Sequence, residues 1–96
     1  LTVGRKEEHM ARIRFRFVLP HAKTVAVAGD FNNWSSTSHP MKRGRDKVWS
    51  VEVELPPGRH EYKFVVDGKE WWNDPEAPKI PNVWGSDNSY VDVPGG

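Results

Sequence analysis

The segment from Arg59 to Pro75 limits the fold most strictly. Within 17 residues it combines an alternating apolar pattern, a turn sequence and a second short strand, as a β-hairpin requires. Its alternating residues divide into an apolar side and a mixed side: Tyr62, Phe64 and Val66 against Glu61, Lys63 and Val65. This two-residue period is typical of a half-buried strand. Asp67-Gly68 supplies the residue types that a tight hairpin turn needs. Since strand neighbours point to opposite faces, we expect one indole of Trp71 and Trp72 to pack inward and the other to be exposed.

The rest of the chain repeats this pattern of short strands between turns. Strands are predicted over residues 11–19, 24–28, 48–55 and 89–93, with a brief pairing near Met41 inside an otherwise irregular segment 35–47. The expected inward residues of the two longest are Ile13, Phe15, Phe17, Leu19, Trp49, Val51, Val53 and Leu55. Pro75, Pro78 and Pro81 are expected to keep residues 74–83 out of regular ladders. No ten-residue window is amphipathic as a helix, so the sequence predicts an all-β, antiparallel β-sandwich.

The length of the chain indicates one domain, and its balanced charge is compatible with neutral partners. The 96 residues fit a single domain, and 14 basic against 13 acidic side chains leave a net charge of +1. Neither nucleic acid nor a membrane is therefore an expected partner. We expect a flexible segment over residues 1–10, a folded domain over residues 11–93 and a linker-like tail over residues 94–96. The start at Leu1, with no leader pattern, suggests a module of a longer cytoplasmic protein.

The sequence contains residue types that serve in catalysis or metal binding, but their spacing fits neither function. The chain has no cysteine, and its four histidines lack the short spacings of metal ligands. Residues 30–32 resemble the start of a calcium loop, but the required glycine and glutamate are missing. Glu52 and Glu54 share an exposed strand face where nothing would raise a pKa for acid catalysis. We expect no enzyme activity, no catalytic residue, no metal and no cofactor.

Five tryptophans in a chain of this size are the feature that needs explaining. Trp49 and one of the pair Trp71 and Trp72 have strand positions that suit a core. Trp34 and Trp84 instead follow turn-forming Gly, Asn and Ser residues, where a large ring is hard to bury. Flat exposed rings beside amide and amine groups suit a ligand with apolar faces and hydroxyl edges. A sugar chain fits this description.

Four motifs in order resemble the family 48 carbohydrate-binding modules, and most closely the glycogen-binding domain of AMP-activated protein kinase beta subunits. They are GDFNNW (29–34), YKFVVDG (62–68), Trp71 shortly before Asp74-Pro75, and WGSDN (84–88), and the likeness covers about residues 11–93. The resemblance implies an immunoglobulin-like, early-set sandwich that binds α-1,4-linked glucan without catalysis. It implies stacking by Trp34 and Trp71, and hydrogen bonding by Lys63 and Asn88. Trp84 and Ser86 would contribute from a loop that threads the glucan.

Two departures from the family pattern leave one site residue open. Trp84 is bulkier than usual, and the link from Gly68 to the tryptophan is one residue longer than in the kinase domain. A two-residue turn at Asp67-Gly68 would pair Phe64 with Trp71 and expose Trp72. Counting back from Asp74-Pro75 places Trp71 at the stacking position, with the extra residue absorbed as a bulge or a longer turn. We favour Trp71.

Two other functions compete with glucan binding. Related early-set sandwiches serve as structural or protein-docking domains of amylolytic enzymes, so other domains of the parent protein are possible partners. The face formed by Arg12, Arg14 and Arg16 is a weaker candidate for nucleic-acid binding, because few aromatics are interleaved with it. Charged residues on a strand also protect it from edge-to-edge pairing.

Overall fold

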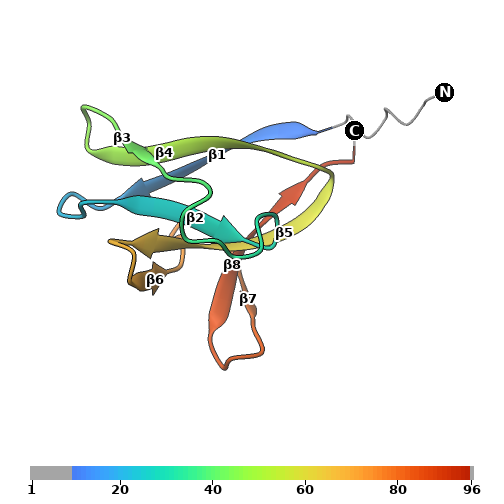
Figure 1. Ribbon diagram of the computed structural model, residues 1–96. Coiled ribbons are helices and arrows are strands. Elements are labelled where there is room, and N and C mark those ends of the chain that lie inside the picture. Colours follow the sequence, from blue (N-terminus) through green and yellow to red (C-terminus); the bar gives the residue numbers. More distant parts are fainter. Residues whose placement is uncertain (1–9, 96) are drawn as a thin grey trace.

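The computed structural model describes residues 10–95 as two antiparallel sheets packed face to face (Figure 1). One sheet has the order β1-β4-β3, formed by Ala11–Val18, Val48–Leu55 and Lys42–Arg43. The other has the order β2-β5-β8-β7, with β6 also paired to β5: Val25–Gly29, Gly58–Val66, Asp87–Val93, Lys79–Pro81 and Glu70–Trp72. The predicted all-β sandwich is confirmed. No helix among these residues is long and apolar enough to cross a membrane.

The structure describes only a small part of the two expected terminal segments, 1–10 and 94–96. Residues 1–9 and 96 lie outside the described residues, and residues 10, 94 and 95 belong to no strand. The division into an N-terminal segment, a domain and a tail therefore stays a prediction.

The core lies where the inward faces of the two sheets meet. The Phe17 and Phe64 rings stack with centroids 4.5 Å apart, and Phe15 meets Tyr62 edge-on at 4.7 Å. Trp49 is buried as predicted, and its indole N–H donates to the Leu19 carbonyl at 3.1 Å. That bond removes the cost of burying a polar N–H. Aromatic side chains from both layers thus fix the sandwich.

The prediction that residues 74–83 stay out of ladders is wrong for β7. Lys79, Ile80 and Pro81 pair with Ser89, Asn88 and Asp87 of β8. In the described sheet β7 has a partner on one side only, and an edge strand tolerates proline because one row of its N–H groups is not used by the sheet. Pro78 also contributes through its carbonyl, which accepts the Tyr90 N–H at 3.1 Å.

The hairpin register settles which face each of the two adjacent tryptophans takes. Phe64 pairs with Trp72, Val65 with Trp71 and Val66 with Glu70. Asp67 and Gly68 adopt φ values of 54° and 71°, and the Lys69 N–H donates to the Val66 carbonyl at 3.0 Å, which leaves Lys69 as an extra residue beside the turn. The register expected from a simple two-residue turn is therefore wrong, and the expectation that a bulge or a longer turn absorbs the extra residue is confirmed.

The expectation that one of these indoles packs inward is only partly right. Trp72 lies on the core side, 6.0 Å from the Phe17 ring, yet it remains 42% exposed, against 46% for Trp71. The reason is that β6 has only three residues and lies at an open edge of the sandwich.

Candidate functional site

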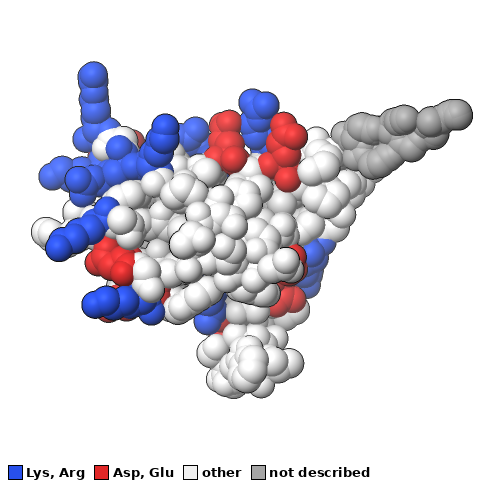
Figure 2. All heavy atoms as spheres, in the orientation of Figure 1, with Lys and Arg blue, Asp and Glu red and all other residues white. Residues whose placement is uncertain are grey.

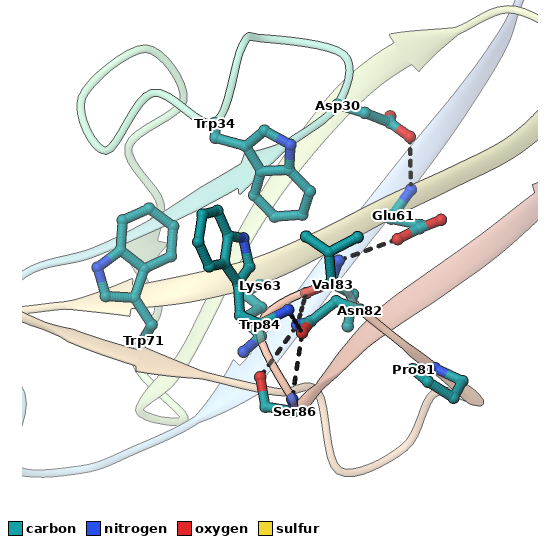
Figure 3. A pocket seen from close by; sticks show the side chains of 11 residues that line it. Asp30, Trp34, Glu61, Lys63, Trp71, Pro81, Asn82, Val83, Trp84 and Ser86 are labelled. Carbon is teal, nitrogen blue, oxygen red and sulfur yellow. Dashed lines mark hydrogen bonds between the residues drawn. The ribbon is translucent and has the colours of Figure 1, made fainter.

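An open groove of about 830 Å³ lies on the outer face of the larger sheet (Figure 3). Six of the seven predicted site residues line it: Trp34, Lys63, Trp71, Trp84, Ser86 and Asn88. Trp72 does not, because the register turns it to the other face. Residues from four separate parts of the chain thus meet at one surface.

Trp34 is held at the groove by a tightly bonded loop after β2. The Asn32 side-chain oxygen accepts the N–H groups of Gly29 at 3.0 Å and Ser35 at 3.2 Å, and its amide donates to the Val27 carbonyl at 3.1 Å. The Trp34 N–H donates to the Gly29 carbonyl at 2.8 Å. Trp34 has a φ of 56°, which is uncommon for a bulky side chain. The loop therefore stabilises an unfavourable backbone conformation and so orients the indole.

Strand β5 supplies the floor of the groove. Lys63 lies opposite Ala28 of β2 and is half-buried between the buried residues Tyr62 and Phe64, whose side chains point to the core. Val65 shares the outer face with Lys63, but it is 2% exposed and is not among the residues that line the groove. A half-buried lysine keeps its ammonium group at the surface while its stem covers apolar neighbours.

The loop between β7 and β8 forms the opposite wall. Val83 and Trp84 are 90% and 87% exposed at its tip, which protrudes from the body of the molecule and carries no charged residue (Figure 2). Asn82 holds the loop: its side-chain oxygen accepts the N–H groups of Trp84 at 2.9 Å and Ser86 at 3.1 Å. The prediction that Trp84 is exposed is confirmed.

Five lining residues were missed by sequence reasoning: Asp30, Glu61, Pro81, Asn82 and Val83. Asn82 offered a signal, since an asparagine that follows proline and precedes a Trp-Gly turn is typical of side-chain-capped turns. Asp30 and Glu61 offered none, because their adjacency depends on pairing between distant strands. The Glu61 N–H donates to the Asp30 carboxylate at 3.0 Å, and the Asp30 N–H donates to the Glu61 carbonyl at 3.0 Å.

A buried polar network supports the sheet behind the groove. The Tyr62 hydroxyl donates to the Asp74 carboxylate at 2.7 Å, and the Asp74 N–H donates to the Ser89 hydroxyl at 2.8 Å. Ser89 is fully buried and donates in turn to the Asn73 side chain at 2.9 Å. Burial, and then the bond to Asp74, raise the pKa of Tyr62 above its ordinary range. The network joins β5, β8 and the segment after β6.

The chemistry of the groove suits a neutral, hydroxylated ligand. Three indoles provide apolar faces, while Lys63, Ser86 and Asn88 provide donors and acceptors beside them. Among residues 10–95, no group of three or more His, Cys, Asp or Glu side chains is arranged to hold a metal ion.

Comparison with known proteins identifies the family. A family model described as the glycogen recognition site of AMP-activated protein kinase matches residues 12–95. The chain is 38% identical over 71 residues to 5'-AMP-activated protein kinase subunit beta-1 of Sus scrofa, covering 74% of this chain and 55% of that protein. It is 39% identical over 71 residues to subunit beta-2 of Mus musculus, covering 74% of this chain and 25% of that protein. The chain therefore belongs to the family of AMP-activated protein kinase glycogen recognition sites, which are non-catalytic glycogen-binding modules.

Proposed function

We propose that this protein is a non-catalytic module that binds α-1,4-linked glucan, such as glycogen, starch or malto-oligosaccharides, in the groove on its larger sheet. The observation that carries the proposal is the convergence of Trp34, Lys63, Trp71, Trp84, Ser86 and Asn88 on one groove. The glycogen-binding family to which the chain belongs supports the ligand class.

In this proposal the indoles bind the apolar faces of the sugar rings. Trp34 and Trp71 stack on two stretches of a curved glucan chain, and the exposed Trp84 contacts the same chain from the opposite loop. Lys63, Ser86 and Asn88 form hydrogen bonds to the glucose hydroxyls. Because an open and hydrated surface gains little beyond stacking and a few hydroxyl bonds, the dissociation constant should be on the order of micromolar to millimolar.

The arginine face supports nucleic-acid binding less well than the groove supports glucan. Arg12 lies 3.9 Å from Glu52 and 3.6 Å from Glu54, and Arg14 lies 3.6 Å from Glu52. These carboxylates offset part of the positive charge that a phosphate backbone would require. The arginine face is therefore better explained as the charged outer face of β1, which protects the strand from edge-to-edge pairing.

A structural or protein-docking role remains the second proposal for this chain. The observation that favours it is the uncharged tip with Val83 and Trp84, since exposed apolar residues at a loop tip are often anchors in protein interfaces. The partners would be other domains of a longer parent protein, in the cytoplasm. This role predicts no affinity for glucan.

Calorimetric titration with maltoheptaose tests the main proposal. Maltoheptaose should bind, and cellohexaose should bind far less well, because its straighter chain does not follow a curved set of platforms. Lys63→Ala should weaken binding at least several-fold with an unchanged melting temperature, while Lys42→Ala, on the opposite sheet, should bind as the wild type. Absence of heat from maltoheptaose at millimolar concentration would leave only the docking role.

A further inference from the structure

The side chain of Asn82 uses all of its hydrogen-bonding capacity at the wall of the groove. Its oxygen accepts the backbone N–H groups of Trp84 at 2.9 Å and Ser86 at 3.1 Å. Its nitrogen donates to the Ser86 hydroxyl at 3.0 Å and to the Asn88 side-chain oxygen at 3.0 Å. A side-chain amide offers two donor hydrogens and two acceptor lone pairs, so every position is filled.

The direction of these bonds is fixed from both ends. Two backbone N–H groups can only donate, so the Asn82 oxygen must face them and its nitrogen must face Asn88. At the other end, the Asn88 nitrogen donates to the Glu61 carboxylate at 2.9 Å. An ionised carboxylate only accepts, which prevents the Asn88 amide from rotating by half a turn. The hydrogen bonds from Asn82 to Asn88 and from Asn88 to Glu61 therefore form a series in which each amide has a single orientation.

Asn88 lies deep in the wall of the groove, and its side chain depends on this series of hydrogen bonds for its alignment. It is 9% exposed, which is unusual for an asparagine unless its polar atoms are satisfied. One amide hydrogen and one oxygen lone pair are engaged by Glu61 and Asn82. Among residues 10–95 no protein group takes the remaining hydrogen or the remaining lone pair, and Asn88 lines the groove.

We propose that Asn82 is the positioning residue of the glucan site, which aligns Asn88 with its nitrogen while it holds the Trp84 loop with its oxygen. This inference rests on the proposed function of the groove. Figure 3 shows Asn82 and Ser86 at the base of the loop, below the Trp84 indole. Bonds that are already made in the free protein reduce the ordering that the ligand must otherwise impose, and affinity rises accordingly.

A purely structural role for Asn82 makes a different prediction from a positioning role. If its bonds only stabilise the loop, variants should lower the melting temperature and lose affinity in proportion. If it aligns Asn88, then losing its donor nitrogen should lower affinity with the loop intact, and this loss should be much smaller when Asn88 is absent, because only the bond from the same nitrogen to the Ser86 hydroxyl then remains to be lost. A double-mutant cycle separates the two roles.

The experiment uses two variants that keep an oxygen acceptor for the loop N–H groups but remove the side-chain nitrogen that donates to Asn88. Asn82→Asp preserves the shape and the oxygen, and Asn82→Ser offers a smaller neutral acceptor in case the carboxylate unfolds the loop. Each is made alone and with Asn88→Ala, and maltoheptaose affinity and melting temperature are measured. Val18→Asp, at an exposed position on β1 of the other sheet, controls for the added charge and should bind as the wild type.

We expect Asn82→Asp and Asn82→Ser to weaken binding about tenfold, to melt within a few degrees of the wild type, and to weaken binding much less in the Asn88→Ala background. Wild-type affinity in both variants would overturn the proposal. So would an equal loss with and without Asn88, or a loss of affinity that follows melting temperature. Failure of the wild type itself to bind maltoheptaose would instead overturn the function on which the proposal rests.

Discussion

Trp71 and Trp72 show, at the scale of single residues, that orientation matters more than exposure. Their exposed fractions are 46% and 42%, but pairing with Val65 and Phe64 sends them to opposite faces of the sheet. Trp71→Ala should abolish measurable maltoheptaose binding and keep the melting temperature. Trp72→Ala should bind normally and lose about 1–3 kcal/mol of stability, less than the roughly 3–5 kcal/mol of a fully buried tryptophan. Titration and thermal melts of both variants check this, and normal melting with lost binding in Trp72→Ala would contradict it.

Tyr62 provides a pH-dependent test of the network behind the groove. Its pKa is raised by burial and by the bond to Asp74, so the folded state keeps the phenolic proton at a pH where the unfolded state loses it. Stability should therefore be complete below about pH 10 and should fall as the pH rises above it, by up to about 1.4 kcal/mol per pH unit.

Tyr62→Phe is the matched variant for this prediction. At neutral pH it should lose about 1.5–3 kcal/mol, because the Asp74 carboxylate loses its donor in a partly buried place. Above about pH 10 its stability should decline less steeply than that of the wild type. Denaturant unfolding between about pH 9 and 11 measures both slopes, and equal slopes would show that Tyr62 ionises as easily in the folded state.

At the scale of elements, Gly29 connects the end of β2 to the loop that carries Trp34. A Cβ at this position would lie 2.4 Å from the Phe31 ring and 2.6 Å from the Glu61 carbonyl oxygen, which is backbone and cannot move alone. Gly29→Ala should therefore cost about 1–3 kcal/mol and displace Trp34, with weaker maltoheptaose binding. Gly44→Ala is the control, because its nearest neighbour is the flexible Asp46 side chain at 3.0 Å. Equal melting temperatures for the two variants would contradict this account.

The elements also show what local patterns can and cannot predict. Alternation located β1, β4 and β5 and their buried faces, because a two-residue period is a property of neighbouring residues. Pairing at β7 escaped prediction, since proline is tolerated at an edge and edges are set by the whole sheet. The same distinction between local patterns and long-range pairing applies to the residues of the site. Motifs identified the three indoles that line the groove, although Trp34 is half-buried and not exposed as expected. The bonds from Asn82 to Asn88 and from Asn88 to Glu61 depend instead on strand register.

At the scale of the whole molecule, the charge distribution separates the groove from the basic surface. Figure 2 shows Lys and Arg side chains gathered near β3 and the start of β4, away from the uncharged tip of the β7–β8 loop. A neutral glucan releases no counterions when it binds, so affinity for maltoheptaose should change little between low and moderate salt. Titrations at about 50 and 200 mM sodium chloride test this. A steep fall in affinity over the same salt range, for any polymer that the protein retains, would favour the arginine face as the binding surface.

The central claim is that three of the five tryptophans bind glucan while two serve the fold. Each indole N–H gives its own resonance in a proton–nitrogen correlation spectrum, and single Trp→Phe variants assign the five. On titration with maltoheptaose, the resonances of Trp34, Trp71 and Trp84 should shift in a saturable way. Those of Trp49 and Trp72, which donate to the Leu19 carbonyl and the Glu70 carboxylate, should stay in place. Shifts confined to Trp49 and Trp72, or no shift at millimolar maltoheptaose, would contradict the account.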